Sequence, residues 1–234
     1  MAREKKRLAK ILDVLEKRYG KPPAPHTTDP YEMLLYTLCG YPASDAACQK
    51  AFPVLKREVG LDPDRILAAP EAKLAKIMRL GGIVPELRAN RLKEVAARVK
   101  NLFGPSLAEA MRKPLPEARK ILKQFPTIGD PGADKILLFS GTAPIAAVPS
   151  NCIHVPVRLG FGNQQKNYAA TYKSVQEVLN VELPLDRESR LRAYLLLKTH
   201  GQETCKANRP RCTDCVVSSE CTYYQSMASG DRHL

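Results

Sequence analysis

The chain has 234 residues, with 37 Lys and Arg against 24 Asp and Glu, and a formal net charge of +13 at pH 7. This excess of positive charge favours a polyanionic partner, nucleic acid before a membrane or an acidic protein. The odd number of cysteines argues against a disulfide scaffold and indicates a reducing compartment. The basic N-terminus lacks the apolar core of a secretory signal, and no apolar run is long enough to span a membrane. We therefore expect a soluble cytoplasmic protein.

Helical periodicity recurs along the chain, and strand signals are nearly absent. An apolar stripe over residues 8–15 predicts the first helix, and Asp29 with Pro30 is the capping signal of a second helix. The tail after Cys221 is expected to be disordered past Tyr224. The sequence therefore predicts an all-α fold. Further helices are predicted over residues 45–59, 71–80, 85–103, 116–124, 131–139, 151–159, 168–179 and 186–200.

Four cysteines near the C-terminus stand in the order C-x6-C-x2-C-x5-C, close enough in sequence to converge on one inorganic centre. Four thiolates in a compact loop suit a 4Fe-4S cluster or a tetrahedral zinc ion. Zinc sites more often use two C-x2-C pairs, and here one such pair is present, so the spacing favours a 4Fe-4S cluster. A zinc knuckle and a pair of disulfides are the alternatives. The predicted ligands are Cys205, Cys212, Cys215 and Cys221.

This cysteine spacing resembles the cluster loop of the endonuclease III family of helix-hairpin-helix DNA glycosylases, the HhH-GPD superfamily, and the resemblance covers nearly the whole chain. It implies a helical-barrel domain over residues 27–143 and an iron-sulfur cluster domain formed by residues 1–26 and 144–234. DNA would bind in the cleft between the two domains. The resemblance further implies a monomer without a membrane partner, which binds damaged or distorted double-stranded DNA in base-excision repair, at the nucleoid in a prokaryote.

Residues 120–141 resemble the helix-hairpin-helix motif, in which turn amides and the N-terminus of the second helix face a DNA phosphate. Thr127 stands where the family usually has its first glycine, while Gly129 keeps the turn small. An ordinary helical connection is the alternative. The phosphate contacts expected here are Thr127, Gly129, Gly132 and Lys135.

Two further groups are expected at the DNA. Lys206, Arg209 and Arg211 lie between the first two cluster cysteines and form a candidate phosphate comb, with a solvated charged loop as the alternative. In the family, the turn after the first core helix carries a residue that wedges into the space left by a flipped base. Pro42 occupies that position here, and Tyr41 beside it either stacks on a base or is an aromatic residue at a helix end.

The resemblance also implies a catalytic Asp shortly after the hairpin and, in members with lyase activity, a nucleophilic Lys at the head of the second hairpin helix. Pro131 stands at the Lys position and Pro149 at the Asp position, and neither has an ionisable group. Asp130 also fits a helix N-cap, and Asp134 also fits a surface charge. The remaining weak candidates for catalysis are Asp130, Asp134, Lys135 and Asn151.

Cleavage of an N-glycosidic bond without an anion near the sugar is easiest when the leaving base is already cationic, as in N-alkylated purines. We therefore expect a monofunctional DNA N-glycosylase that acts on a labile or alkylated base by hydrolysis, without AP-lyase activity. The alternative is a catalytically inactive protein of the same fold that binds DNA damage or distorted DNA. A redox carrier is a third interpretation, which the basic and helical sequence disfavours.

Overall fold

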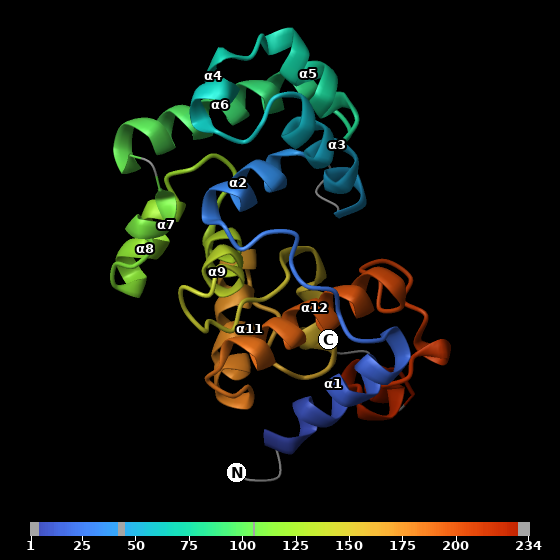
Figure 1. Ribbon diagram of the computed structural model, residues 1–234. Helices are drawn as coiled ribbons and strands as arrows, with labels where there is room; N and C mark the ends of the chain where they lie inside the picture. The colour runs from blue at the N-terminus through green and yellow to red at the C-terminus, as the bar shows by residue number, and fades with distance from the viewer. Residues whose placement is uncertain (1–4, 42–44, 105, 229–234) are drawn as a thin grey trace. The chain divides into compact units, whose positions relative to one another are not determined.

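The computed structural model describes residues 5–41, 45–104 and 106–228, and these residues confirm the predicted all-α fold (Figure 1). Extended backbone pairs there at one isolated bridge, between Tyr41 and Gly82. The chain divides into two compact units, unit 1 of residues 1–25 and 137–234 and unit 2 of residues 26–136. The second boundary thus falls inside a helix rather than after residue 143. No helix in the described ranges has the length and apolar character needed to cross a bilayer.

Unit 2 is a set of short helices in which α4 and α5 pack on α6, and α2 packs on α3 and α6. The sequence-based prediction missed α4, although its N-terminus repeats the Asp-Pro signal of α2: Asp62 accepts hydrogen bonds from the amides of the first turn, and Pro63 follows it. The helices of this unit are α2 (Pro30–Leu38), α3 (Asp45–Glu58), α4 (Pro63–Ala68), α5 (Glu71–Arg79), α6 (Pro85–Phe103), α7 (Leu107–Ala110), α8 (Leu115–Leu122) and the start of α9 (Asp130–Phe139).

Unit 1 joins the two ends of the chain, because α1 packs on α11 and α12. The apolar stripe of α1 is fully buried, and Arg7 donates to the backbone carbonyls of Leu159 and, at 2.9 Å, of Glu220. Its elements are α1 (Lys5–Tyr19), the end of α9, the short 3-10 helix η1 (Ser150–Cys152), α10 (His154–Arg158), α11 (Tyr168–Glu182), α12 (Arg187–Glu203), η2 (Cys212–Asp214), η3 (Ser218–Glu220) and α13 (Thr222–Ala228).

The C-terminal tail is ordered further than the sequence predicts. Residues 222–228 form α13, so the expectation of disorder past Tyr224 is wrong for residues 225–228. Contacts with α10 explain the difference: the Thr222 hydroxyl donates to the Arg158 carbonyl at 2.9 Å, and the Arg158 guanidinium lies 4.9 Å from the centre of the Tyr223 ring. Tertiary contacts with distant residues therefore stabilise a helix that the local sequence does not predict.

Two buried arginines satisfy backbone carbonyls where helices end. In unit 2, Arg88 is 2% exposed and donates to the carbonyls of Cys39 at 3.0 Å and Gly82 at 2.9 Å. In unit 1, Arg190 is 4% exposed and donates to the Pro184 carbonyl at 2.9 Å. Burial lowers the pKa of both guanidinium groups, although arginine stays charged at physiological pH. Part of the basic composition is thus internal and structural.

Two ion pairs join α8 to α9 across the hairpin. Arg119 contacts the buried Asp134 carboxylate at 2.6 Å, and Lys123 contacts the half-exposed Asp130 carboxylate at 2.7 Å. Asp134 is therefore not a surface charge. Asp130 is not the N-cap either, because α9 begins at Asp130 and the Gly129 carbonyl accepts the first helical bond. Both carboxylates serve the packing of the hairpin.

We predict that Asp134→Ala destabilises the protein far more than Asp130→Ala. Removing the buried carboxylate leaves Arg119 without its partner, a change that costs about 3 kcal/mol, the lower end for buried pairs because Arg119 keeps 31% of its side chain in solvent. The exposed pair of Asp130 contributes about 0.5 kcal/mol. Urea unfolding of both variants measures the difference, and equal losses of stability would contradict this assignment.

Candidate metal centre and nucleic-acid interface

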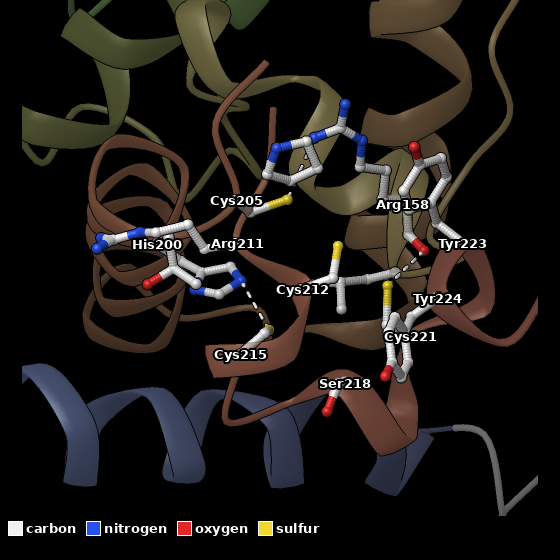
Figure 2. Close-up of a pocket in the computed structure, with 13 residues that line it drawn as sticks. Arg158, His200, Cys205, Arg211, Cys212, Cys215, Ser218, Cys221, Tyr223 and Tyr224 are labelled. Atoms are coloured by element: carbon white, nitrogen blue, oxygen red, sulfur yellow. Dashed lines mark hydrogen bonds between the residues drawn. The ribbon is translucent and has the colours of Figure 1, made fainter. Parts of the chain in front are cut away.

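The four predicted cysteine ligands line one pocket of unit 1 (Figure 2). Figure 2 shows their sulfur atoms around the same space, although the residues come from different turns of the chain. Cys205 follows α12, Cys212 opens η2, Cys215 follows η2, and Cys221 follows η3. The short spacing in the sequence thus brings all four cysteines to the lining of one pocket.

Tight turns of the backbone produce this arrangement. The Cys205 amide donates to the His200 carbonyl at 2.8 Å, at the end of α12. The Cys215 amide donates to the Cys212 carbonyl at 3.3 Å, and the Cys221 amide to the Ser218 carbonyl at 3.1 Å. Each turn reverses the chain within a few residues, so that four cysteines within 17 consecutive positions, residues 205–221, reach one pocket.

Arg158 of α10 holds the loop closed. Its guanidinium donates to the carbonyls of Lys206 and Ala207, each at 2.8 Å, and lies 3.5 Å from the Cys205 sulfur. Its own backbone carbonyl accepts from the Cys221 thiol at 3.2 Å. One residue therefore contacts both the first and the last cysteine of the loop.

His200 closes the other side of the pocket and is 1% exposed. Its Nδ1 atom lies 2.9 Å from the Tyr19 hydroxyl, and its Nε2 atom lies 3.7 Å from the Cys215 sulfur. Burial, with a smaller contribution from the charge of His154, lowers the pKa of His200 to about 4. The imidazole is therefore neutral at physiological pH, and it packs the end of α12 against α1.

The chemistry of the pocket fits a thiolate-bound inorganic centre. Burial raises the pKa of the Cys205, Cys212 and Cys215 thiols, so their thiolates require a neighbouring positive charge. Arg158 supplies part of that charge at Cys205. Four sulfur donors around one space are the ligand set of an iron-sulfur cluster or of zinc. Within the ranges described, no three His, Cys, Asp or Glu side chains are gathered around a single ion position.

In the hairpin turn, Thr127 and not Gly129 has a positive φ, which differs from the sequence-based expectation. Thr127 is exposed and has a φ of +67°, a left-handed conformation that a β-branched residue rarely adopts. Gly129 has no positive φ, and a Cβ atom there would meet nothing nearer than Pro131 at 3.8 Å. Gly132 and Lys135 are partly exposed along the first turns of α9. The position at which glycine is favoured is therefore Thr127.

The basic residues of the cysteine loop are exposed, as a phosphate contact requires. Arg209 has a φ of +55°, and the Arg211 guanidinium donates to the Glu203 carbonyl, which fixes that side chain to the end of α12. In unit 2, Tyr41 is 49% exposed beside the bridge to Gly82. Pro42, the predicted wedge, lies outside the described residues. Lys206 is also exposed.

The two prolines at the expected catalytic positions occupy different environments. Pro131 lies in the first turn of α9 and is partly exposed. Pro149 ends a buried run of five residues, 145–149, and the exposed Ser150 and Asn151 follow it in η1. Tyr168, which the sequence analysis did not single out, is 45% exposed, and its hydroxyl lies 3.5 Å from the Ser150 carbonyl. Its position in the first turn of a helix, after the capping Asn167, was the available signal.

Comparison with known proteins gives long alignments. The chain is 27% identical to endonuclease III of Treponema pallidum over 212 residues, which are 89% of this chain and 92% of that protein. It is 28% identical to endonuclease III of Sulfolobus acidocaldarius over 200 residues, 85% and 84% of the two chains. Over most of its length, the chain therefore resembles proteins named endonuclease III.

The fold agrees with this similarity. The structure of a non-covalent endonuclease III-DNA complex superposes with a TM-score of 0.75 at 21% identity, over 96% of this chain and 98% of that one. A search against sequence models of known families gives no match. At Thr127, Pro131 and Pro149 the chain carries other residues than the resemblance described above leads us to expect.

We predict that Thr127→Gly stabilises the protein by up to about 1 kcal/mol. Glycine removes a left-handed strain of about 1–2 kcal/mol, and its greater freedom in the unfolded chain offsets part of that gain. For a chain of this size the rise in melting temperature is about 2–4 °C. Thr127→Ala keeps the strained Cβ atom and is the matched control, with an expected melting temperature close to that of the wild type. A lower melting temperature for Thr127→Gly than for Thr127→Ala in thermal unfolding would refute this account.

Proposed function

We propose that this protein is a DNA-repair glycosylase that binds double-stranded DNA and releases a damaged base. The observation that carries the proposal is the alignment with proteins named endonuclease III over most of both chains. A net charge of +13 and a fold shared with a protein in complex with DNA support the same partner.

The proposed cofactor is a 4Fe-4S cluster held by Cys205, Cys212, Cys215 and Cys221. The 6-2-5 spacing of the four cysteines, with one C-x2-C pair instead of two, supports this choice over a single zinc ion. When bound, such a cluster supplies a covalent cross-link between turns of the loop and a centre capable of electron transfer. The protein's part is to exclude water with His200 and to balance thiolate charge with Arg158, at 3.5 Å from the nearest sulfur.

The proposed DNA contacts come from three places. The hairpin turn offers the amides of residues 127–132 and the Lys135 side chain to a phosphate, and the cysteine loop adds Lys206, Arg209 and Arg211. Tyr41 and Pro42 would fill the space left by an extruded base. The exposure of Tyr41 and of the three loop cations supports these roles, because each side chain has surface free for a ligand.

The proposed reaction is hydrolysis of a labile or alkylated base without strand cleavage. Proline at the positions of the family's Lys and Asp provides neither an amine for a Schiff base nor a carboxylate near the sugar cation. The nearby carboxylates are engaged elsewhere, since Asp130 pairs with Lys123 and Asp134 with Arg119. A cationic base is the leaving group that needs least help, and this supports N-alkylated purines as the substrate class.

A second candidate is a protein of the same fold that binds damaged or distorted DNA without excising a base. The replacement of both expected catalytic residues by Pro131 and Pro149 favours it. Base release from a lesion panel distinguishes the two candidates, because both bind the lesion and only the glycosylase frees a base.

We expect anaerobically purified protein to be brown and to contain about four iron and four sulfide per chain. Cys212→Ser removes one ligand and should lower both contents. Cys48→Ala is the control, since Cys48 is buried in α3 and does not line the pocket, and its loss should leave the iron content unchanged. Stoichiometric zinc without sulfide in the wild type would show that the centre is a zinc site.

We expect Pro149→Asp to accelerate base release from at least one alkylated or oxidised substrate. A carboxylate at this position would stabilise the sugar cation, and preorganised groups of this kind are worth on the order of 10² to 10³ in rate. Pro149→Asn is the uncharged control of the same shape and should give no acceleration. The readout is free base from a lesion-containing duplex in single-turnover assays. Efficient release by the wild type that Pro149→Asp slows would mean that another residue does the chemistry.

The same chain should form no covalent adduct with abasic DNA in borohydride, because Pro131 supplies no amine. Lys135→Ala is the control for the nearest amine on α9. A strong adduct that disappears in Lys135→Ala would contradict the proposed absence of AP-lyase activity.

A further inference from the structure

An exposed aromatic side chain stands beside the segment that replaces the expected catalytic carboxylate. Tyr168 begins α11, and 45% of the residue is exposed. Its hydroxyl lies 3.5 Å from the backbone carbonyl of Ser150, the residue after Pro149.

Two contacts fix the Tyr168 ring: one with the Tyr172 ring and one between its hydroxyl and the Ser150 carbonyl. It stacks on the Tyr172 ring with centroids 6.4 Å apart and an interplanar angle of 27°. Tyr172 is only 4% exposed, and its hydroxyl lies 3.5 Å from the Val148 amide, so the lower ring is fixed to the buried run before Pro149. An aromatic side chain with few rotatable bonds, fixed in this way, keeps its open surface in one orientation.

The start of α11 is equally well defined. The Asn167 side chain accepts a hydrogen bond from the Ala170 amide at 2.9 Å, which caps the helix one residue before Tyr168. Burial of the phenol raises the pKa of Tyr168, so the hydroxyl is neutral at physiological pH and remains a hydrogen-bond donor. The ring thus lies beside the Ser150 carbonyl, and the exposed Asn151 is the next residue of the chain.

We propose that Tyr168, with Ser150 and Asn151 beside it, forms a nucleobase-binding surface on which an extruded base stacks. The proposal rests on the proposed function, which brings a DNA nucleotide to the segment after Pro149. A flat, oriented ring offers a π-face to any base, and the neighbouring polar groups offer hydrogen-bond partners to the base edge. Binding at this surface needs no carboxylate, which fits a chain with proline at the position of the usual Asp.

The test compares the affinity of three duplexes that share one flanking sequence. One is fully paired, one carries a single unpaired adenine, and one carries a stable abasic analogue. The unpaired adenine is extruded at little cost and brings a base to the surface, whereas the abasic analogue brings the sugar alone. Stacking on an aromatic side chain strengthens binding by about 5- to 100-fold per base.

The variants separate the ring from the hydroxyl and from the fold. Tyr168→Ala and Tyr168→Leu should lose about tenfold in affinity for the unpaired-adenine duplex and little for the other two. Tyr168→Phe keeps the ring and should bind that duplex nearly as the wild type does. Val181→Ala is the matched control, because Val181 is 64% exposed near the far end of the same helix. Leucine keeps an apolar side chain against Tyr172, so Tyr168→Leu provides the test if Tyr168→Ala does not fold.

Each outcome decides between the two proposals. If the wild type prefers the unpaired-adenine duplex and all Tyr168 variants keep that preference, the nucleobase surface lies elsewhere while the proposed function stands. If the wild type binds the three duplexes equally, extrusion of a base fails as a function, and the Tyr168 proposal fails with it. Selective loss in Tyr168→Ala and Tyr168→Leu, with Tyr168→Phe unaffected, supports both.

Discussion

Every helix leaves four carbonyl groups at its C-terminal end without intrahelical partners, and a chain built of short helices must satisfy many of them inside the protein. Arginine side chains meet this constraint repeatedly. Arg88 binds carbonyls of two loops in unit 2, and Arg158 binds two carbonyls of the cysteine loop. Arg187 donates to the Leu138 and Phe139 carbonyls at the end of α9. The core of each unit depends on these bonds, because an unsatisfied buried carbonyl costs about 1–3 kcal/mol.

This use of arginine changes how the charge of the chain is interpreted. A net charge of +13 implies a polyanionic partner, yet some of the guanidinium groups are buried and have no surface for phosphate. The exposed cations of the cysteine loop stand in a different position, because Arg158 and the turns between the cysteines fix the backbone that carries them. The cations proposed to contact DNA therefore depend on the same closed loop that Arg158 of α10 holds through its carbonyl contacts.

Three residues bear on the proposed reaction: Pro131, Pro149 and Tyr168. Pro131 and Pro149 remove the amine and the carboxylate of the family pattern, and Tyr168 adds a fixed aromatic ring beside Ser150. An aromatic surface binds a base through stacking and a carboxylate stabilises a cation at the sugar, so the two serve different steps. The combination favours recognition of an extruded base over strong electrostatic assistance to bond cleavage. It is consistent with a substrate whose base leaves readily.

The sequence by itself determined the all-α fold, most helix positions and the convergence of four cysteines, because periodicity, capping residues and short spacings are local properties of the chain. Only the tertiary structure decided which polar groups are buried and what they contact. Asp134 looks like an exposed helix residue until α8 brings Arg119 against it, and α13 forms because Thr222 and Tyr223 meet Arg158. Likewise, the Tyr168 hydroxyl contacts the carbonyl of Ser150, which lies 18 residues earlier in the chain. Contacts between residues far apart in sequence leave no periodic signal, so sequence patterns locate the helices and the cysteine loop but not the partners of individual side chains.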